Sequence, residues 1–235
     1  MNLRALVHLI TVLALSCTLS FALSGCALTS KGTALSPRFF SPDSADDATR
    51  PSRPASPAPA SSPLALRLGG VEAASHIEER MSYRLHGSEL GYHDDRRWTE
   101  RPEEYVRRAL ESELFERRGV RRIVAGAAST LDVELTAFEE LRGPPARVRL
   151  SLRFTLHDER EASLERSLTV ERPLGADAGA DHAARVASAL GAALDAAVTE
   201  VSERVTEELA SLRQQPDEPA AGAVEITGAR APLRQ

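Results

Sequence analysis

Cysteine is almost absent from the sequence, since only Cys17 and Cys26 occur among 235 residues, and both lie in the first tenth of the chain. No disulfide framework can cross-link the remainder, so the body must be held together by burial of apolar side chains. Aromatic residues make up only 4%, and the core must therefore consist mainly of Leu, Val and Ala. The net charge of −5 argues against a nucleic-acid-binding protein, which usually presents a basic face.

Sequence motifs of catalysis are also missing. No G-x-S-x-G nucleophile motif or Walker A sequence occurs, and Gly69-Gly70 lacks the further glycines of a phosphate-binding loop. His93 to Asp95 and His157 to Glu159 contain residue types that bind metals. Adjacent residues of an extended chain point to opposite sides, however, and polar turns at strand ends explain both runs. The sequence predicts no enzyme, no cofactor and no metal site.

The N-terminus has the pattern of a processed leader. Arg4 precedes an apolar stretch from Ala5 to Leu23, which ends in Leu-Ser-Gly-Cys at Cys26. These four residues resemble the bacterial lipobox. The resemblance implies that residues 1–25 are removed, with Cys17 among them, and that Cys26 carries covalent acyl chains.

An uncleaved transmembrane helix is the alternative for this leader, since roughly 20 apolar residues can span a bilayer. His8 and several Ser and Thr residues make the stretch a poor span. The residue after Cys26 is Ala27 rather than Asp. In Gram-negative lipoproteins an Asp there tends to retain the protein at the inner membrane, so the outer membrane, facing the periplasm, is favoured.

The composition changes twice along the mature chain. Residues 26–63 are dominated by Ser, Pro, Ala, Asp and Thr, which predicts a disordered, extended tether reaching on the order of 100 Å. Residues 214–235 are again rich in Pro, Ala and Gly, which predicts a disordered tail. The folded domain is expected between them, at residues 64–213.

Hydrophobic periodicity predicts an α+β fold for this domain. Apolar side chains alternate with polar ones from Leu131 to Leu135 and from Ala146 to Leu156, which is typical of strands with one wet face. Helical spacing appears at 101–118 and 180–212. We expect further strands at 64–71, 81–86, 89–93, 120–124 and 162–170. These elements predict a curled antiparallel sheet packed against two helices in two layers.

Two features suggest a contact with a partner, and each has a structural alternative. Trp98 is the sole tryptophan and would suit a binding hot spot, or it closes the core before the first helix. Arg147, Arg149 and Arg153 form a basic strip on one strand, which would suit lipid headgroups or an acidic partner. Pairing with Glu134 and Glu165 on neighbouring strands would use up those charges instead.

The last helix offers a second contact hypothesis. Its Leu/Val stripe is explained by the core, but it also carries alanines that would allow another subunit to approach closely, as in a homo-oligomeric ring. They are Ala187, Ala189, Ala192, Ala193, Ala196 and Ala197.

The order of these pieces resembles the ABC-type transport auxiliary lipoproteins, the family that includes paraquat-inducible protein C. The resemblance covers roughly residues 64–212 and is most specific from Ile77 to Leu114, although His76 stands where the family often has tyrosine and the usual proline after the first strand is missing. The positions that fit the family pattern are Ile77, Arg80, Leu90, Trp98 and Glu100.

The resemblance implies a task and partners. Members are non-enzymatic, lipid-anchored proteins that work with an MCE-domain protein and its membrane complex, either a permease with an ATPase or an integral membrane partner, in moving lipids or other hydrophobic molecules. Some are thought to form rings. We therefore expect a protein that docks such a transporter to the outer membrane. Two alternatives remain open: an envelope lipoprotein that activates a cell-wall synthase, and a periplasmic shuttle that binds lipid in a sizeable apolar cavity.

Overall fold

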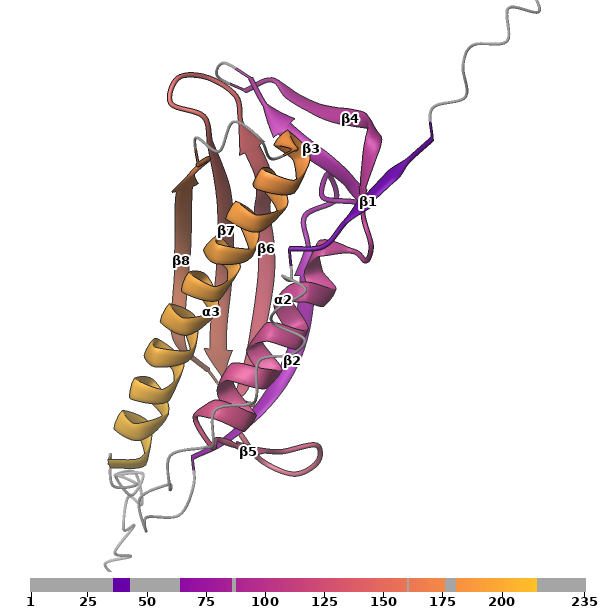
Figure 1. The fold of residues 1–235 in the computed structure, drawn as a ribbon. Helices are drawn as coiled ribbons and strands as arrows, with labels where there is room; N and C mark the ends of the chain where they lie inside the picture. Colours follow the sequence, from indigo (N-terminus) through magenta and orange to yellow (C-terminus); the bar gives the residue numbers. More distant parts are fainter. Residues whose placement is uncertain (1–35, 43–63, 86–87, 160, 176–180, 215–235) are drawn as a thin grey trace, which may run out of the picture. The chain divides into compact units, whose positions relative to one another are not determined.

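The computed structural model describes residues 36–42, 64–85, 88–159, 161–175 and 181–214. All the described helices and strands lie in one compact unit (Figure 1). The strands are β1 Arg38–Phe40, β2 Ala65–Ala73, β3 Arg80–Arg84, β4 Leu90–Trp98, β5 Arg121–Arg122, β6 Thr130–Leu141, β7 Arg147–His157 and β8 Ala162–Pro173. The helices are α2 Pro102–Glu111, which continues into the π-helical turn Ser112–Arg117, and α3 His182–Gln214. Among the described residues, no helix combines the length and apolar character needed to span a bilayer.

The strands form one open sheet around β6. On one side of β6, its first half pairs with β2 and its end pairs with β3; β7 and then β8 continue the sheet on the other side. Beyond β3 lie β4 and β1, and beyond β2 lies β5. The α+β prediction is confirmed. The expected antiparallel sheet is corrected to a mixed one, because β6 runs parallel to both β2 and β3.

The long antiparallel strands follow their predicted alternation. Leu131, Val133 and Leu135 of β6 are buried, as are all the even-numbered residues of β7 from Val148 to Leu156. A register shift between Leu135 and Ala137 then reverses the faces of β6, since one extra residue exchanges inward and outward positions. As a result Phe138 enters the core, and two glutamates follow it in the sheet.

Gly69 and Gly70 lie at a second irregularity, where β2 bulges against β6. The pairs Leu68–Leu131 and Val71–Val133 leave one extra residue on β2. The side chain of Asp132 fills the space above Gly69, and its Oδ1 accepts a hydrogen bond from the Gly70 N–H at 2.6 Å. A β-carbon on Gly69 would collide with Asp132 Oδ1. The glycine pair therefore serves this backbone approach, and not a phosphate.

Both helices cover the same face of the sheet (Figure 1). The helix α2 packs on β2, with Pro102 in its first turn, and Gly119 follows its π-helical extension at φ 66°. That positive φ is the conformation in which glycine ends a helix at least cost. The helix α3 lies over β7 and β8. The buried stripe of α3 consists of Val186, Leu190, Leu194, Val198, Val201, Val205 and Leu209.

Candidate functional site

A strand inside the predicted tether is docked on the body. The strand β1 pairs in parallel with the end of β4, and the Thr99 N–H donates to the Phe40 carbonyl at 3.0 Å. Arg38 forms an ion pair with Asp181 just before α3, and its guanidinium also lies 5.0 Å from the ring centre of Phe40. The Phe40 side chain packs against the core. The tether prediction is corrected here, because residues 38–40 belong to the sheet.

Asp181 joins this docked strand to α3. Its Oδ1 accepts a hydrogen bond from the Ala183 N–H at 2.9 Å, as a residue that caps a helix N-terminus does. The hydrogen bond from Arg38, with that from Ala183, lowers the pKa of Asp181 below its usual value. The docked segment thus binds the group that caps α3.

Gly191 provides the second seat of the same segment. A β-carbon at Gly191 would come closer to the carbonyl oxygen of Pro42 than 3.0 Å, a separation below which real β-carbons are essentially never found. A glycine inside a helix costs about 1 kcal/mol relative to alanine. The residue lies within an alanine-rich stretch of α3, so the backbone of Pro42 gives the physical reason for a glycine there.

Glu140 is the centre of a buried polar cluster at the same end of the sheet. Its carboxylate, 3% exposed, accepts hydrogen bonds from His182 Nε2 of α3 at 2.9 Å and from His93 Nε2 of β4 at 3.3 Å. Arg142 Nε lies 3.6 Å from the same carboxylate, and its guanidinium is 3.5 Å from the Tyr83 ring centre. The cluster ties β4, β6 and α3 together.

The electrostatics of the cluster favour ionised Glu140. Burial alone would raise the pKa of its carboxyl. The hydrogen bonds from His93 and His182, with the charges of His182 and Arg142, outweigh burial and lower the pKa from 4.5 to about 2. Glu140 is therefore charged at neutral pH, and its role is to hold its neighbours in place.

Glu139 is buried on the opposite face of the sheet. Arg84 donates to both of its carboxylate oxygens, at 2.9 Å and 3.0 Å, and Arg149 lies 3.7 Å away. This two-pronged hydrogen bond raises the pKa of Arg84. Glu139 and Glu140 thus bind side chains of neighbouring elements on opposite faces of β6. Neither glutamate was predicted as a structural centre, because their only local signal is a break in the alternation of apolar and polar residues at Thr136.

At the other end of the sheet, Asp132 pairs with His157. His157 Nε2 donates to Asp132 Oδ2 at 2.8 Å. This hydrogen bond, with the one to the Asp158 carbonyl, raises the pKa of His157. Asp132 also lines a hollow of about 370 Å³, together with Glu72, Glu134 and Arg153.

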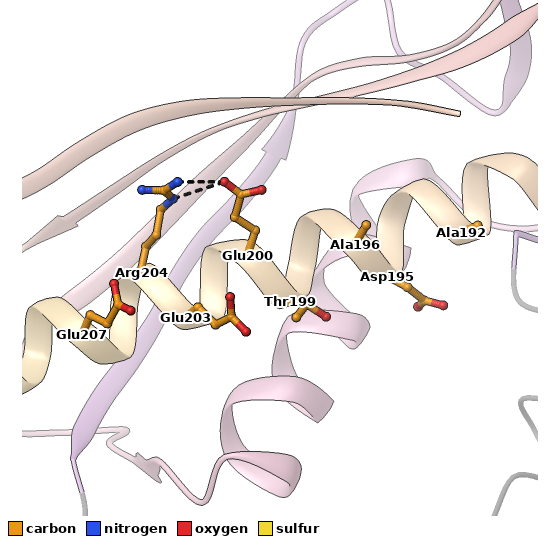
Figure 2. A pocket seen from close by; sticks show the side chains of 8 residues that line it. All are labelled: Ala192, Asp195, Ala196, Thr199, Glu200, Glu203, Arg204 and Glu207. Carbon is orange, nitrogen blue, oxygen red and sulfur yellow. Dashed lines mark hydrogen bonds and ion pairs between the residues drawn. The ribbon is translucent and has the colours of Figure 1, made fainter. Parts of the chain in front are cut away.

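A larger open hollow of about 700 Å³ lies along the outer face of α3 (Figure 2). Arg204 pairs with Glu200 at 2.9 Å, and Arg118 reaches Glu203 at 3.3 Å. The charged groups of the lining are four carboxylates and one arginine, and the hollow is open to solvent along its length. The residues that line it are Ala192, Asp195, Ala196, Thr199, Glu200, Glu203, Arg204 and Glu207.

Trp98 lies in the core. Its side chain is 2% exposed, and its ring centre is 5.0 Å from that of Phe138 and 6.4 Å from that of Tyr105. The partner-contact hypothesis for Trp98 does not fit this burial. Its alternative, a residue that closes the core before α2, does fit.

The basic strip of β7 is paired with glutamates. Arg153 Nη1 lies 2.8 Å from Glu134, whereas Arg147 and Arg149 share Glu171 at 2.9 Å and 2.8 Å. Glu171, rather than the expected Glu165, is the β8 partner. The strip therefore presents less free charge than the sequence suggests.

The two histidine–acid runs are separated in the fold. His93 is buried within β4, not at a strand end as expected, because it reaches Glu140. Among the described residues, no three His, Cys, Asp or Glu side chains converge as a metal site. Of the six alanines on the last helix, Ala187, Ala193 and Ala197 are buried, so only part of that set faces outward. Cys26, the leader 1–25 and the tail 215–235 lie outside the described residues.

The fold is shared with solved protein structures. A Xanthomonas campestris protein of family DUF330 is 20% identical, with a TM-score of 0.61 over 76% of this chain and 99% of that one. A second structure, an uncharacterized protein, is 13% identical, with a TM-score of 0.52 over 61% and 93%. At these identities the likeness concerns the fold alone. Comparison with curated protein sequences finds no match.

The family of ABC-type transport auxiliary lipoprotein components matches residues 49–205. This range contains every described strand except β1, and it also contains most of α3. The chain belongs to the ABC-type transport auxiliary lipoprotein family.

Proposed function

We propose that the protein is a non-enzymatic accessory lipoprotein that docks an MCE-type, ABC-type lipid transporter to the outer membrane on its periplasmic side. The observation that carries the proposal is the family match over residues 49–205. A membrane-anchored auxiliary component contributes by holding partners in position, while the permease, the ATPase or an integral membrane partner moves the hydrophobic cargo.

The anchor in this proposal is acylated Cys26. The Leu-Ser-Gly-Cys motif supports it, and Ala27 at the following position supports the outer membrane. Several acyl chains, at about 0.8 kcal/mol per buried methylene, hold a protein stably in a bilayer. Mass spectrometry of the native protein tests the anchor: an acylated N-terminal Cys26 is expected, and an intact leader with a free thiol would refute it.

The arrangement of polar groups supports a holding role. Glu139 and Glu140 are engaged by arginine and histidine side chains from other strands and from α3. Apolar side chains of both layers form one cluster between sheet and helices. The two hollows described above lie on outer surfaces with charged linings. These features suit a rigid body with contact surfaces better than a carrier with a lipid-filled interior.

Co-purification of the full-length, membrane-extracted protein tests the partner. An MCE-domain protein is the expected companion. A penicillin-binding protein in its place would favour the activator of a cell-wall synthase. The lipid shuttle predicts a different result: a secreted Cys26→Ser protein would carry phospholipid into native mass spectrometry without detergent, whereas we expect the bare protein mass.

A further inference from the structure

We propose that the end of the sheet where β1 enters faces the lipid leaflet that holds Cys26, at short range, and that arginines at this end contact anionic phospholipid headgroups. The inference rests on the lipid anchor of the proposed function. It adds an orientation, a distance and a lipid-contacting surface to that function. The body would not move freely at the end of a long spacer.

The docked segment, residues 38–42, is held at a defined place on the body. The pairing of β1 with β4, the Arg38–Asp181 ion pair and the approach of Pro42 to Gly191 attach the segment to β4, to the residue that caps α3 and to α3 itself. Phe40 adds apolar contact with the core. A segment fixed by a strand, a cap and a helix backbone holds the chain at a defined place on the body.

The second step is the length of chain that remains. Only residues 27–37, eleven residues, separate Cys26 from Arg38 in the sequence. At about 3.5 Å per residue the twelve steps from Cys26 to Arg38 span at most roughly 40 Å. The Pro-rich residues 50–63 lie beyond β1, between two strands of the same sheet. They add nothing to the distance between the body and the lipid.

The third step identifies the end that faces the lipid. The strand β1 runs parallel to β4, and β4 begins at Leu90, which pairs with Arg84 beside Leu141 at the end of β6. The chain therefore enters β1 from the end that carries the β3–β4 and β6–β7 turns and the start of α3 (Figure 1). The β5 strand and the β7–β8 turn lie at the other end of β6, about 36 Å away for its twelve residues.

Basic groups are available for headgroup contact at the β1 end. At the β1 end, Arg172 is exposed and has no ion-pair partner among the described residues, and Arg142 and Arg147 are partly exposed. The acidic groups there include Glu139 and Glu140, which are buried, and Glu171 and Asp181, which are paired with arginines. Glu89 and Asp94 are exposed, and the half-buried Asp95 lies 3.8 Å from Arg96. The opposite end exposes groups of both signs, among them Glu159, Glu161 and Glu207 and also Arg117, Arg121 and Arg122. An anionic leaflet attracts basic groups near its surface and repels acidic ones.

A depth measurement on membrane-anchored protein tests the orientation. The mature body has no cysteine besides Cys26, so Ala146→Cys in the β6–β7 turn and Ala125→Cys in the β5–β6 loop give a matched pair of exposed labelling sites. Full-length lipidated protein is placed in vesicles of phosphatidylethanolamine and phosphatidylglycerol that contain a headgroup spin label. We expect fluorescence at position 146 to be quenched several-fold more than at 125, and equal or reversed quenching would overturn the inference.

A variant at Gly191, which Pro42 approaches, tests whether docking of residues 38–42 causes the orientation. Gly191→Ala displaces Pro42 while favouring the helix, so the protein stays folded; Ser188→Ala on the exposed face is its control. We expect Gly191→Ala to reduce the quenching difference and Ser188→Ala to preserve it. If folded Gly191→Ala protein keeps the full difference in quenching between positions 146 and 125, docking of residues 38–42 does not set the orientation.

Vesicle composition and partner assays separate the remaining claims. Replacing phosphatidylglycerol by phosphatidylcholine should weaken quenching at position 146, and unchanged quenching would overturn the headgroup contact. A protein that washes off the vesicles lacks its anchor, which overturns this inference and the proposed function together. Asymmetric quenching without an MCE partner in co-purification would refute only the proposed function.

Discussion

His182, the first residue of α3, donates a hydrogen bond to buried Glu140 of β6 at 2.9 Å. The helix α3 otherwise contacts the sheet through aliphatic side chains, which tolerate sliding. A directional bond at its first turn fixes where the helix begins relative to the strands, since hydrogen bonds constrain both distance and angle.

Loss of the Glu140 carboxylate should destabilise the fold in a pH-dependent way. Glu140→Gln leaves His93, His182 and Arg142 without their anion, and we expect a loss of about 2–3 kcal/mol at pH 7. Because the folded pKa of about 2 lies below the ordinary value of 4.5, the stabilisation is complete above pH 4.5. It fades as the pH falls toward 2.

Urea unfolding of wild type and Glu140→Gln between pH 7 and pH 2 measures this difference. Exposed Glu165→Gln on β8 is the control and should change stability by less than about 0.5 kcal/mol. A wild-type advantage that stays constant down to pH 2 would contradict the assigned role of Glu140.

The Asp132–His157 pair should show the opposite pH dependence. Because the folded-state pKa of His157 is raised, the pair stabilises the fold fully below the unfolded value of 6.5. This contribution is lost as the pH rises through the higher folded-state pKa. An NMR titration of the His157 ring should give a pKa above that of exposed histidines. Asp132→Asn should lower the pKa of His157. An unchanged pKa in this variant would show that the pair does not form in solution.

Gly69 and Gly70 should differ sharply in their tolerance of alanine. A methyl group on Gly69 meets Asp132 Oδ1 and Thr130 Cγ2, whereas one on Gly70 finds its nearest atom at 3.5 Å. We expect Gly69→Ala to cost about 1–3 kcal/mol in thermal unfolding and Gly70→Ala to cost little. The double variant Gly69→Ala/Asp132→Ala should recover part of the loss, and equal effects of the two single variants would disprove the close approach.

Trp98 should report on the core. Its burial predicts blue-shifted fluorescence and weak quenching by iodide in the native state, with a red shift on unfolding. Trp98→Ala should cost about 3–5 kcal/mol, because it removes contacts with Phe138 and Tyr105. Strong iodide quenching in the folded protein would instead place Trp98 at the surface.

The sequence predicted those elements whose signal is local. The alternation from Val148 to Leu156 and the helical stripe from Val186 to Leu209 both depend on burial of one face, and both predictions are confirmed. The π-helical turn beginning at Ser112 was not predicted, since its apolar spacing continues that of α2. The predicted end of this helix at residue 118 agrees with the structure, where Gly119 follows it at a positive φ, a conformation that favours glycine.

Features that depend on distant partners left no such signal. The parallel pairing of β6 with β2 and β3 follows from the order of strands in the sheet, which no local pattern encodes. The strand β1 is three residues long within a Pro- and Ser-rich stretch, and its place is explained only by Asp181 and Gly191. The cluster around Glu140 joins residues from β4, β6 and α3, so neither histidine could be assigned to it beforehand.

The parallel pairing of β2 with β6 has a consequence for the order of folding. The paired residues Arg67 and Thr130 are separated by more than sixty positions, whereas β6, β7 and β8 are successive hairpins. Closing a long loop costs more chain entropy and proceeds more slowly than zipping a hairpin. During synthesis from the N-terminus, β2 therefore cannot pair with β6 until the middle of the chain has been made. We infer that the β6–β8 meander folds first and that β2 and β3 then pair with it.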